Sequence, residues 1–226
     1  MAKLESAART AAHAATGPAD ATVQSRPTVP EVVLASASRA RAQILRRAGV
    51  HCVLDAAAVD EEGIRRAMAA EGAPVGEVAE TLAELKAQRV SRHHPGALVI
   101  GADQMLECAG MWFEKPVDSD QARAQLVALR GRDHELVSCV CVVQDKQRLW
   151  HHLGRARLTM RPFTDEFLDA YLAAVEPSAL ECVGSYRLEG RGAQLFSKIE
   201  GDYFTILGLP LLPLLEFLRS HGVVKP

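Results

Sequence analysis

The chain has 226 residues, and its 26 Lys and Arg against 28 Asp and Glu give a formal net charge of −2. That balance does not supply the broad positive surface of a protein built to hold nucleic-acid backbone. Hydrophobic residues are 48% and charged residues 24% of the chain, which is ordinary globular usage and excludes disorder throughout. The longest apolar stretch, residues 206–218, contains Pro210, Pro213 and Glu216, so no membrane-spanning helix is expected.

The cysteines indicate a reducing compartment. Their number is odd, they include no C-x-x-C pair, and most stand inside apolar runs; they are Cys52, Cys108, Cys139, Cys141 and Cys182. We therefore expect reduced core thiols of a soluble cytoplasmic protein, with no disulfide set and no zinc site.

The first 29 residues differ in composition from the rest. They are rich in Ala and Thr, contain Pro18 and Pro27, and lack the apolar region of a secretion signal. We interpret residues 1–29 as a disordered N-terminal extension or the product of a misplaced start site, with a mitochondrial-type transit peptide as the alternative. Residues 30–226 are expected to form one domain.

Strand and helix patterns alternate through that domain. The first half predicts a buried strand at 31–35, a helix from the Ser38 cap to about Ala48, a helix over 76–92 and a buried strand at 97–102. The second half predicts a helix opening at Asp118, two β segments at 135–143 and 147–160, a helix capped by Thr164, a glycine-rich loop, a hairpin around 200–202 and a last helix after Pro210. This order predicts an α/β fold with a mixed sheet and flanking helices.

Charged residues that interrupt apolar patterns are the candidate functional residues. Arg41 precedes Ile44 and Leu45 on the buried face of its helix, one turn after the hydroxyls of Ser36 and Ser38. Hydroxyls and a cation at a helix N-terminus favour an anion, so these residues form a candidate phosphate site. The alternative is a helix cap with a structural ion pair.

Lys86 and Asp103 are two further interruptions. Lys86 lies in an otherwise apolar i, i+4 row with Val78, Leu82 and Val90, either as a functional cation or as a lysine whose head reaches water. Asp103 follows the apolar segment 98–102, at the predicted carboxyl end of a strand where α/β sheets commonly bind ligands; the alternative is a turn residue.

Other charged residues and one histidine are weaker candidates for functional residues, because they interrupt no apolar pattern. Asp60, Glu61 and Glu62 are predicted in a loop, either solvated or, together with Asp103, holding a divalent cation. Lys115 follows a short aromatic turn and faces either a ligand or water. His134 is a candidate acid/base group or a structural residue at a strand start.

Together these residues favour a phosphate-bearing substrate. Fixed cations, hydroxyls and carboxylates suited to Mg²⁺ or Mn²⁺ can stabilise the charge that develops at phosphorus. The chain has no G-x-x-x-x-G-K-[ST] loop and no G-x-G-x-x-G after the first strand, which excludes a P-loop NTPase and argues against a dinucleotide-binding fold.

The order of these motifs resembles the Maf family of nucleoside triphosphate pyrophosphatases. The resemblance covers about residues 32–218 and rests on Leu34-Ala35-Ser36-Ala37-Ser38 with Arg41, Val59-Asp60-Glu61, Leu82-Ala83 with Lys86-Ala87, Gly101-Ala102-Asp103-Gln104, Lys115-Pro116, Gly131-Arg132 with His134, Gly184-Ser185-Tyr186 with Glu189-Gly190, Ile199-Glu200-Gly201-Asp202-Tyr203 and Leu207-Gly208-Leu209-Pro210-Leu211. Each motif is weak alone, but their shared order is specific.

The resemblance implies an elongated α/β molecule with a cleft between two lobes, like the inosine triphosphate pyrophosphatases and often a homodimer. It also implies metal-dependent hydrolysis of a nucleoside triphosphate to the monophosphate and pyrophosphate. By motif, Asp103 would activate water and Asp103 and Glu61 would hold Mg²⁺ or Mn²⁺. Ser36, Ser38, Arg41, Lys86 and Lys115 would bind and neutralise phosphates.

The departures from the family pattern concern the base. Arg39 and Ala40 replace a Pro followed by a bulky or basic residue, so a base contact is lost or Arg39 supplies it. Gln104 and Glu189 stand where pyrimidine-directed members usually have Thr and Gln, which resembles the subgroup acting on 7-methyl-GTP. A carboxylate at 189 could accept hydrogen bonds from guanine and would favour the cationic ring that N7 methylation creates.

Two other functions compete with the enzyme. A nucleotide-binding regulator of cell division, acting through protein partners, would not need the Asp103 carboxylate, so Asp103→Asn separates it from the enzyme. An RNA-binding module using Arg39, Arg41, Arg46 and Arg47 conflicts with the charge balance and with aromatic residues that form no stacking cluster.

Overall fold

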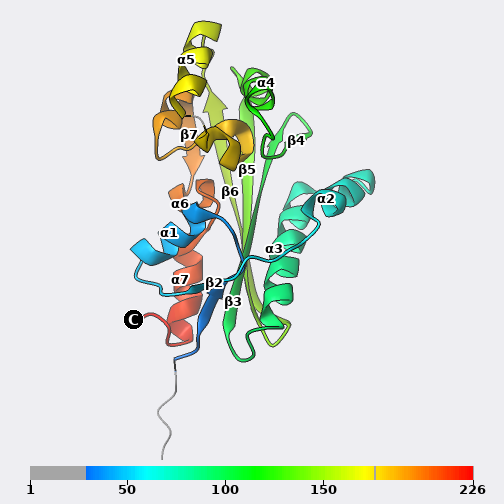
Figure 1. Cartoon of the computed structure of the whole chain (residues 1–226), viewed down its shortest axis with the longest axis vertical. Helices are drawn as coiled ribbons and strands as arrows, with labels where there is room; N and C mark the ends of the chain where they lie inside the picture. Colours follow the sequence, from blue (N-terminus) through cyan, green and yellow to red (C-terminus); the bar gives the residue numbers. More distant parts are fainter. Residues whose placement is uncertain (1–28, 176, 226) are drawn as a thin grey trace, which may run out of the picture.

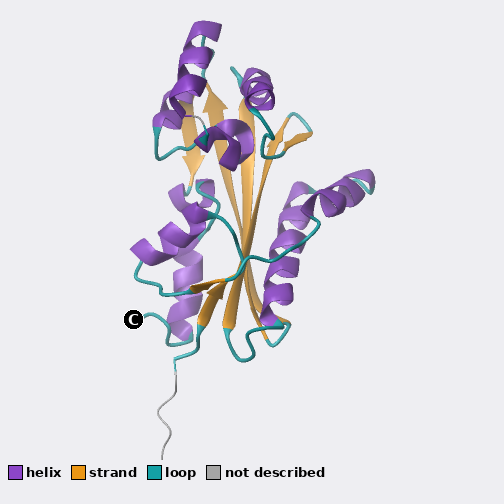
Figure 2. Cartoon of the chain, in the orientation of Figure 1, coloured by secondary structure: helices purple, strands orange, loops and turns teal. Residues whose placement is uncertain are grey.

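One long twisted sheet runs along the molecule, with helices on both of its faces (Figures 1 and 2). The computed structural model describes residues 29–175 and 177–225, so the predictions for residues 1–28 lie outside the described residues. None of the helices in these ranges is long and apolar enough to cross a membrane.

The sheet is mixed, as the sequence predicts. Its order is β2 (Val53–Leu54), β1 (Val32–Leu34), β3 (Leu98–Cys108), β5 (Asp133–Gln144), β6 (Gln147–Met160) and β7 (Phe196–Gly201), and β4 (Met111–Phe113) pairs with β3 to complete the 7-stranded sheet. β1 runs parallel to β2 and β3, and the remaining pairs are antiparallel.

The helices begin where capping side chains are available. They are α1 (Arg39–Arg47), α2 (Glu61–Ala70), α3 (Val75–Ser91), α4 (Ser119–Leu129), α5 (Asp165–Val175), α6 (Tyr203–Ile206) and α7 (Leu211–Ser220), with 3-10 turns η1 (Ser178–Glu181), η2 (Val183–Ser185) and η3 (Arg191–Leu195). Ser38, Asp118 and Thr164 accept hydrogen bonds from backbone N–H groups three residues later, which confirms the predicted caps.

Three apolar clusters divide the molecule into two lobes. In the lower lobe, α3 covers one face of the sheet and α1 and α7 cover the other. In the upper lobe, α4, α5 and the 3-10 turns pack around a third cluster. The cysteines are all free, and Cys139 and Cys141 lie side by side on the β5 face under α3, as their spacing predicts.

β3 connects the lobes and changes neighbours between them. Its first residues pair with β1 up to Ile100, and its last residues pair with β4 from Leu106 onward. Between these positions one edge of β3 has no strand beside it among the described residues. Because side chains alternate along a strand, Asp103 faces α3 and Gln104 faces α6 at this open edge.

Two predictions about the segments that carry Asp103 and Lys115 are wrong. β3 does not end before Asp103 but continues to Cys108, because residues 104–107 pair with β5 and residues 106–108 pair with β4. Asp103 therefore lies in the middle of a strand. The aromatic segment before Lys115 is also not a turn, because it forms the short strand β4.

Two further segments differ from the sequence predictions. The expected loop at residues 60–62 is the start of α2, where the Asp60 carboxylate caps the helix by accepting from Gly63 N–H at 3.0 Å. The expected hairpin at residues 200–202 does not exist, because β7 ends at Gly201 and Asp202 caps α6.

Close packing of α3 on β3 requires glycine at position 101. A Cβ added there would lie 2.1 Å from the Ala83 carbonyl oxygen and 2.8 Å from the Ala87 Cβ. We expect Gly101→Ala to lower the free energy of unfolding by about 2 kcal/mol or more, measured by urea denaturation, because backbone would have to move.

Gly190→Ala is the matched control for this substitution. A Cβ at Gly190 would meet its nearest atom at 3.8 Å, so its unfolding free energy should stay near that of the wild type. Equal stability of the two variants would contradict the packing argument.

Candidate functional site

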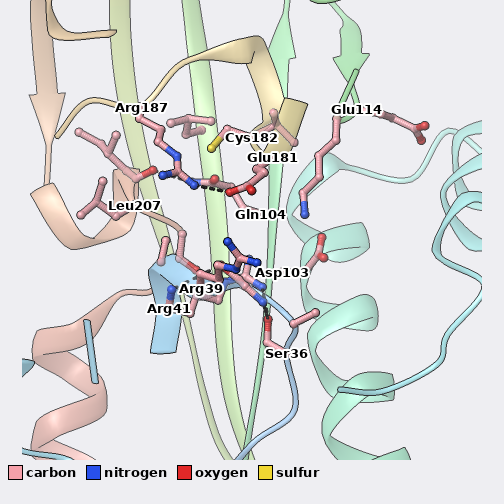
Figure 3. A pocket seen from close by; sticks show the side chains of 18 of the residues that line it. Ser36, Arg39, Arg41, Asp103, Gln104, Glu114, Glu181, Cys182, Arg187 and Leu207 are labelled. Atoms are coloured by element: carbon pink, nitrogen blue, oxygen red, sulfur yellow. Dashed lines mark hydrogen bonds and ion pairs between the residues drawn. The ribbon is translucent and has the colours of Figure 1, made fainter. Parts of the chain in front are cut away.

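A cavity of about 530 Å³ opens at the free edge of β3, between the two lobes (Figure 3). Every residue that the family resemblance assigns to catalysis or binding lines it: Ser36, Ser38, Arg41, Glu61, Lys86, Asp103, Gln104, Lys115 and Glu189. A cavity of this size is typical of small-molecule sites. Residues separated by as much as 153 positions in the chain therefore reach one space.

Arg41 organises the loop at the N-terminus of α1. Its Nε donates to the Gly208 carbonyl at 2.8 Å, and its Nη1 donates to the Ala102 carbonyl at 2.7 Å and to Ser36 Oγ at 3.2 Å. Burial lowers the pKa of Arg41, and the nearby Asp103 and Glu61 carboxylates oppose that shift. Arg41 thus ties the loop at Ser36 to the open edge of β3 and keeps a cation beside it.

A buried ion pair lies on the α3 side of β3. Lys86 Nζ donates to Asp103 Oδ1 at 2.7 Å and lies 2.8 Å from Glu61 Oε1. Lys86 is 6% exposed and Asp103 3% exposed, so the lysine does not extend to water. The row of Val78, Leu82, Lys86 and Val90 is buried along its whole length, which confirms the predicted inward face.

One oxygen of this pair has no partner. Asp103 Oδ2 is buried and accepts no hydrogen bond within residues 29–175 and 177–225, while Oδ1 receives the lysine. An unsatisfied buried carboxylate oxygen is costly, and such groups mark ligand or catalytic sites. Because Asp103 lines the cavity, this unpaired oxygen is a candidate contact for a bound molecule.

Glu61 is held ionised by its neighbours. Burial alone would raise the pKa of its carboxyl, but Lys86 and Arg65 outweigh that effect and lower the pKa below its usual value. Arg65 Nη2 lies 2.8 Å from Glu61 Oε2, and its side chain also approaches Asp103. Glu61 and Asp103 thus face the same two cations, Lys86 and Arg65.

Arg65 was missed in the sequence. It lies four residues after Glu61, a spacing that places the pair on one face only if both are helical. The segment was predicted to be a loop, so this relation was hidden. The Asp60 cap ahead of the carboxylates was the available signal for a helix.

Gln104 lies on the opposite side of β3 from Asp103. Its Nε2 donates to Ser138 Oγ at 3.0 Å and to the carbonyls of Thr205 at 3.1 Å and Ile206 at 3.0 Å. These acceptors fix the orientation of the amide. Gln104 therefore offers the cavity an oxygen acceptor and has no free N–H donor.

The upper wall of the cavity comes from the 3-10 turns and was only partly predicted. Glu189 is exposed at the rim, and Arg187 Nη2 lies 2.5 Å from Glu181 Oε2 beside Cys182 (Figure 3). Burial raises the pKa of the Cys182 thiol, which agrees with a reduced cysteine. Glu181 and Arg187 could not be predicted from the sequence, because the segment of 3-10 turns that contains them has no helical or strand period that a charge could interrupt.

Lys115 and Arg39 are exposed cations at the rim. Neither has an ion-pair partner in the part of the chain that the structure describes. Lys115 follows β4 in the upper lobe and Arg39 begins α1 in the lower lobe, so they approach the cavity from opposite lobes. Both are free to meet an anion that enters.

His134 is not at the cavity. Its Nε2 lies 2.7 Å from the Tyr186 hydroxyl, and its ring packs between Tyr186 and Phe196. Burial lowers the pKa of His134 to about 4, so the imidazole is neutral at pH 7. The structural interpretation of His134 is confirmed, and Tyr186, which lines the cavity, is the residue that it supports.

The carboxylates at the cavity suit a divalent cation that binds together with a substrate. No group of three or more His, Cys, Asp or Glu side chains within the described residues is arranged to hold a metal alone. Mg²⁺ commonly uses one or two carboxylates and completes its shell with water and substrate phosphates. Asp103, with its unpaired Oδ2, and Glu61 match that donor set.

Fold and site together define an α/β protein with a cleft in which carboxylates and cations meet. The chain belongs to the Maf-like protein family, whose family model matches residues 31–221. It is 56% identical over 194 residues to a nucleoside triphosphate pyrophosphatase of Paramagnetospirillum magneticum, covering 86% of this chain and 100% of that protein.

Other relatives have similar coverage. A nucleoside triphosphate pyrophosphatase of Granulibacter bethesdensis is 52% identical, covering 84% of this chain and 97% of that protein. A 7-methyl-GTP pyrophosphatase of Rhizobium johnstonii is 47% identical, covering 86% of this chain and 98% of that protein. The resemblance drawn from the motifs is thereby confirmed at the level of the family.

The buried His134 makes stability depend on pH. The imidazole of the unfolded chain has a pKa of about 6.5. Between that pH and about pH 4, the unfolded state binds a proton that the folded state does not. Folding stability should therefore fall as pH falls through this window. From pH 7 to pH 5 the loss from this group is about 2 kcal/mol.

Urea denaturation at pH 7 and pH 5 tests this expectation. In His134→Gln, which cannot titrate, the difference in unfolding free energy between the two pH values should shrink by that amount. His51→Gln, at an exposed position, is the control and should behave like the wild type. An unchanged pH dependence in His134→Gln would show that His134 is not the responsible group.

Proposed function

We propose that the protein hydrolyses nucleoside triphosphates between the α- and β-phosphates, releasing the monophosphate and pyrophosphate. The observation that carries the proposal is the unpaired Asp103 Oδ2, buried in the cavity beside the Ser36 to Arg41 loop. The relatives named nucleoside triphosphate pyrophosphatase, aligned over nearly their whole length, support the reaction.

Asp103 supplies the base in this reaction. Its Oδ1 is occupied by Lys86, so Oδ2 is the oxygen that accepts the proton of an attacking water. The water oxygen bonds to the α-phosphorus, and the bond from that phosphorus to the bridging oxygen breaks, so pyrophosphate leaves with the electron pair. Lys86 orients the carboxylate through its contact with Oδ1.

The cations of both lobes bind the phosphates. Ser36 and Ser38 offer hydroxyls at the start of α1, and Arg41 holds their loop in place. Lys115 and Arg39 at the rim neutralise the remaining charge, because neither is engaged by a carboxylate of the described chain. Fixed charges of this kind stabilise the transition state more than the ground state.

Asp103 and Glu61 would hold Mg²⁺ or Mn²⁺. A bound divalent cation would polarise the phosphate oxygens and lower the pKa of its bound water. The donor set supports this proposal because both side chains are carboxylates and the lowered pKa of Glu61 keeps it ionised at neutral pH.

Asp103→Asn tests the proposed base. We expect hydrolysis to fall by at least about 10²-fold, because the amide cannot accept the proton. The measurement is release of monophosphate and pyrophosphate, resolved from diphosphate and phosphate, with Mg²⁺ or Mn²⁺ and each of 7-methyl-GTP, dTTP, UTP, CTP, 5-methyl-UTP, GTP and ITP.

Glu62→Gln is the control for this experiment. Glu62 neighbours Glu61 on α2, but it pairs with Arg66 and does not line the cavity. Its activity should match the wild type. If Asp103→Asn retained full activity, or if the wild type turned over none of these nucleotides with either metal, the proposed function would be wrong.

We further propose a preference for modified or non-standard bases, with 7-methyl-GTP as the first candidate. Gln104 presents only its amide oxygen, which suits the N–H donors of guanine, and the Glu189 carboxylate at the rim suits a cationic ring. Relatives named 7-methyl-GTP pyrophosphatase, from Rhizobium johnstonii and Rhizobium meliloti, support this candidate.

The exchange Gln104→Thr with Glu189→Gln tests the base preference. We expect kcat/KM for 7-methyl-GTP to fall relative to that for dTTP or UTP by about 10-fold, because an acceptor and a negative charge are removed. The ratio of kcat/KM values on one enzyme preparation is the readout. An unchanged substrate ranking would exclude these residues as determinants of the base.

The family also leads us to propose a homodimer in the cytoplasm. Size-exclusion chromatography with light scattering measures the oligomeric state, and fractionation of the source cells measures the location. Both are independent of the catalytic proposal.

A further inference from the structure

Arg65 contacts more acidic groups of the cavity than its helix position requires. Its Nη2 lies 2.8 Å from Glu61 Oε2 and 3.6 Å from Asp103 Oδ1, and its Nη1 lies 3.9 Å from Glu114 Oε1. An ordinary i, i+4 pair on α2 would account for Glu61 alone. Arg65 thus joins three carboxylates that come from α2, β3 and the segment after β4.

The helix that carries Arg65 is lightly anchored. α2 has no fully buried side chain, and only Ile64 and Met68 pack partly against the core. Figure 1 shows α2 projecting from the end of α3 at the margin of the molecule. The pairs from Glu61 to Lys86 and from Arg65 to Asp103 therefore contribute to holding its first turn at the cavity.

Arg65 lies where it competes with a divalent cation. The carboxylates that suit a metal, Glu61 and Asp103, are the ones its guanidinium already contacts. A metal bound there would replace that attraction by repulsion between like charges a few ångströms apart. The displaced guanidinium would need another anion.

The phosphates of the substrate are the anion within reach. Arg65 lines the same cavity as Lys115 and contacts Glu114, the residue before it. A guanidinium binds phosphate through paired N–H donors, which makes it well suited to a leaving pyrophosphate. Lys86 lines the cavity as well, but it is buried and its Nζ is held by both Asp103 and Glu61.

We propose that Arg65 is a further substrate-binding residue, which pairs with Glu61 and Asp103 in the free protein and transfers to the pyrophosphate part of the nucleotide when metal and substrate bind. This inference rests on the proposed function. It implies that Arg65 opposes binding of the metal alone and favours binding of the metal together with phosphate.

Two binding measurements on Arg65→Gln test these opposite effects without turnover. In calorimetric titration with Mn²⁺ alone, the variant should bind about 3- to 10-fold more tightly than the wild type, because a competing cation is gone. In titration with inorganic pyrophosphate in the presence of Mn²⁺, the variant should bind about 10-fold more weakly or worse, because a charge-assisted contact is lost.

Arg66→Gln is the matched control. Arg66 is the next residue of α2 and pairs with Glu62 away from the cavity, so both affinities should equal those of the wild type. Arg65→Lys, which keeps the charge, should restore part of the pyrophosphate affinity. Thermal unfolding of each variant confirms that α2 remains folded against the domain.

The opposite signs separate this role from a structural one. If Arg65 only held α2 in place, its removal would weaken Mn²⁺ and pyrophosphate binding together. Unchanged or weaker Mn²⁺ binding, or unchanged pyrophosphate binding, in Arg65→Gln overturns the proposal. Failure of the wild type to hydrolyse any nucleotide would instead count against the proposed function, since both titrations are read without hydrolysis.

Discussion

The buried pair between Lys86 and Asp103 is the interaction on which the site depends. Neither charge could be buried alone, because removing one partner of such a pair leaves an uncompensated charge in the interior. Their 2.7 Å contact requires α3 to lie close on β3, and Gly101 permits that approach by having no side chain against the Ala83 carbonyl. The packing of the lower lobe and the charge state of the site therefore have a common origin.

The cavity exists because β3 changes neighbours along its length. β1 ends at Leu34 and β4 pairs only from Leu106, so the middle of β3 has a free edge between two lobes. Because side chains alternate along the strand, Asp103 on one face contacts cations, while Gln104 on the other face donates to backbone carbonyls of α6. Both faces open to the same space around that edge.

The sequence revealed the residues of the site better than their setting. Arg41 and Lys86 were found because a charge in an apolar helical row conflicts with its period, and both proved buried. Asp103 was found for a partly wrong reason, since its strand continues to Cys108. Arg65 was missed because its segment was expected to be a loop, whereas it is a helix without a buried residue. Arg187 was missed because it lies in the irregular segment between η2 and η3, where no helical or strand period exists to be interrupted.

The free protein contains an imbalance that its ligands would remove. Within the described residues, Asp103 Oδ2 has no hydrogen-bond partner, and Lys115 and Arg39 at the rim are cations without a carboxylate partner. A metal alone would satisfy the carboxylate but repel Arg65, and a triphosphate alone would satisfy the rim but repel Glu61 and Asp103. Under the proposed function each ligand would relieve the repulsion that the other meets, so the charges of this cleft would favour the binding of both together over the binding of either one.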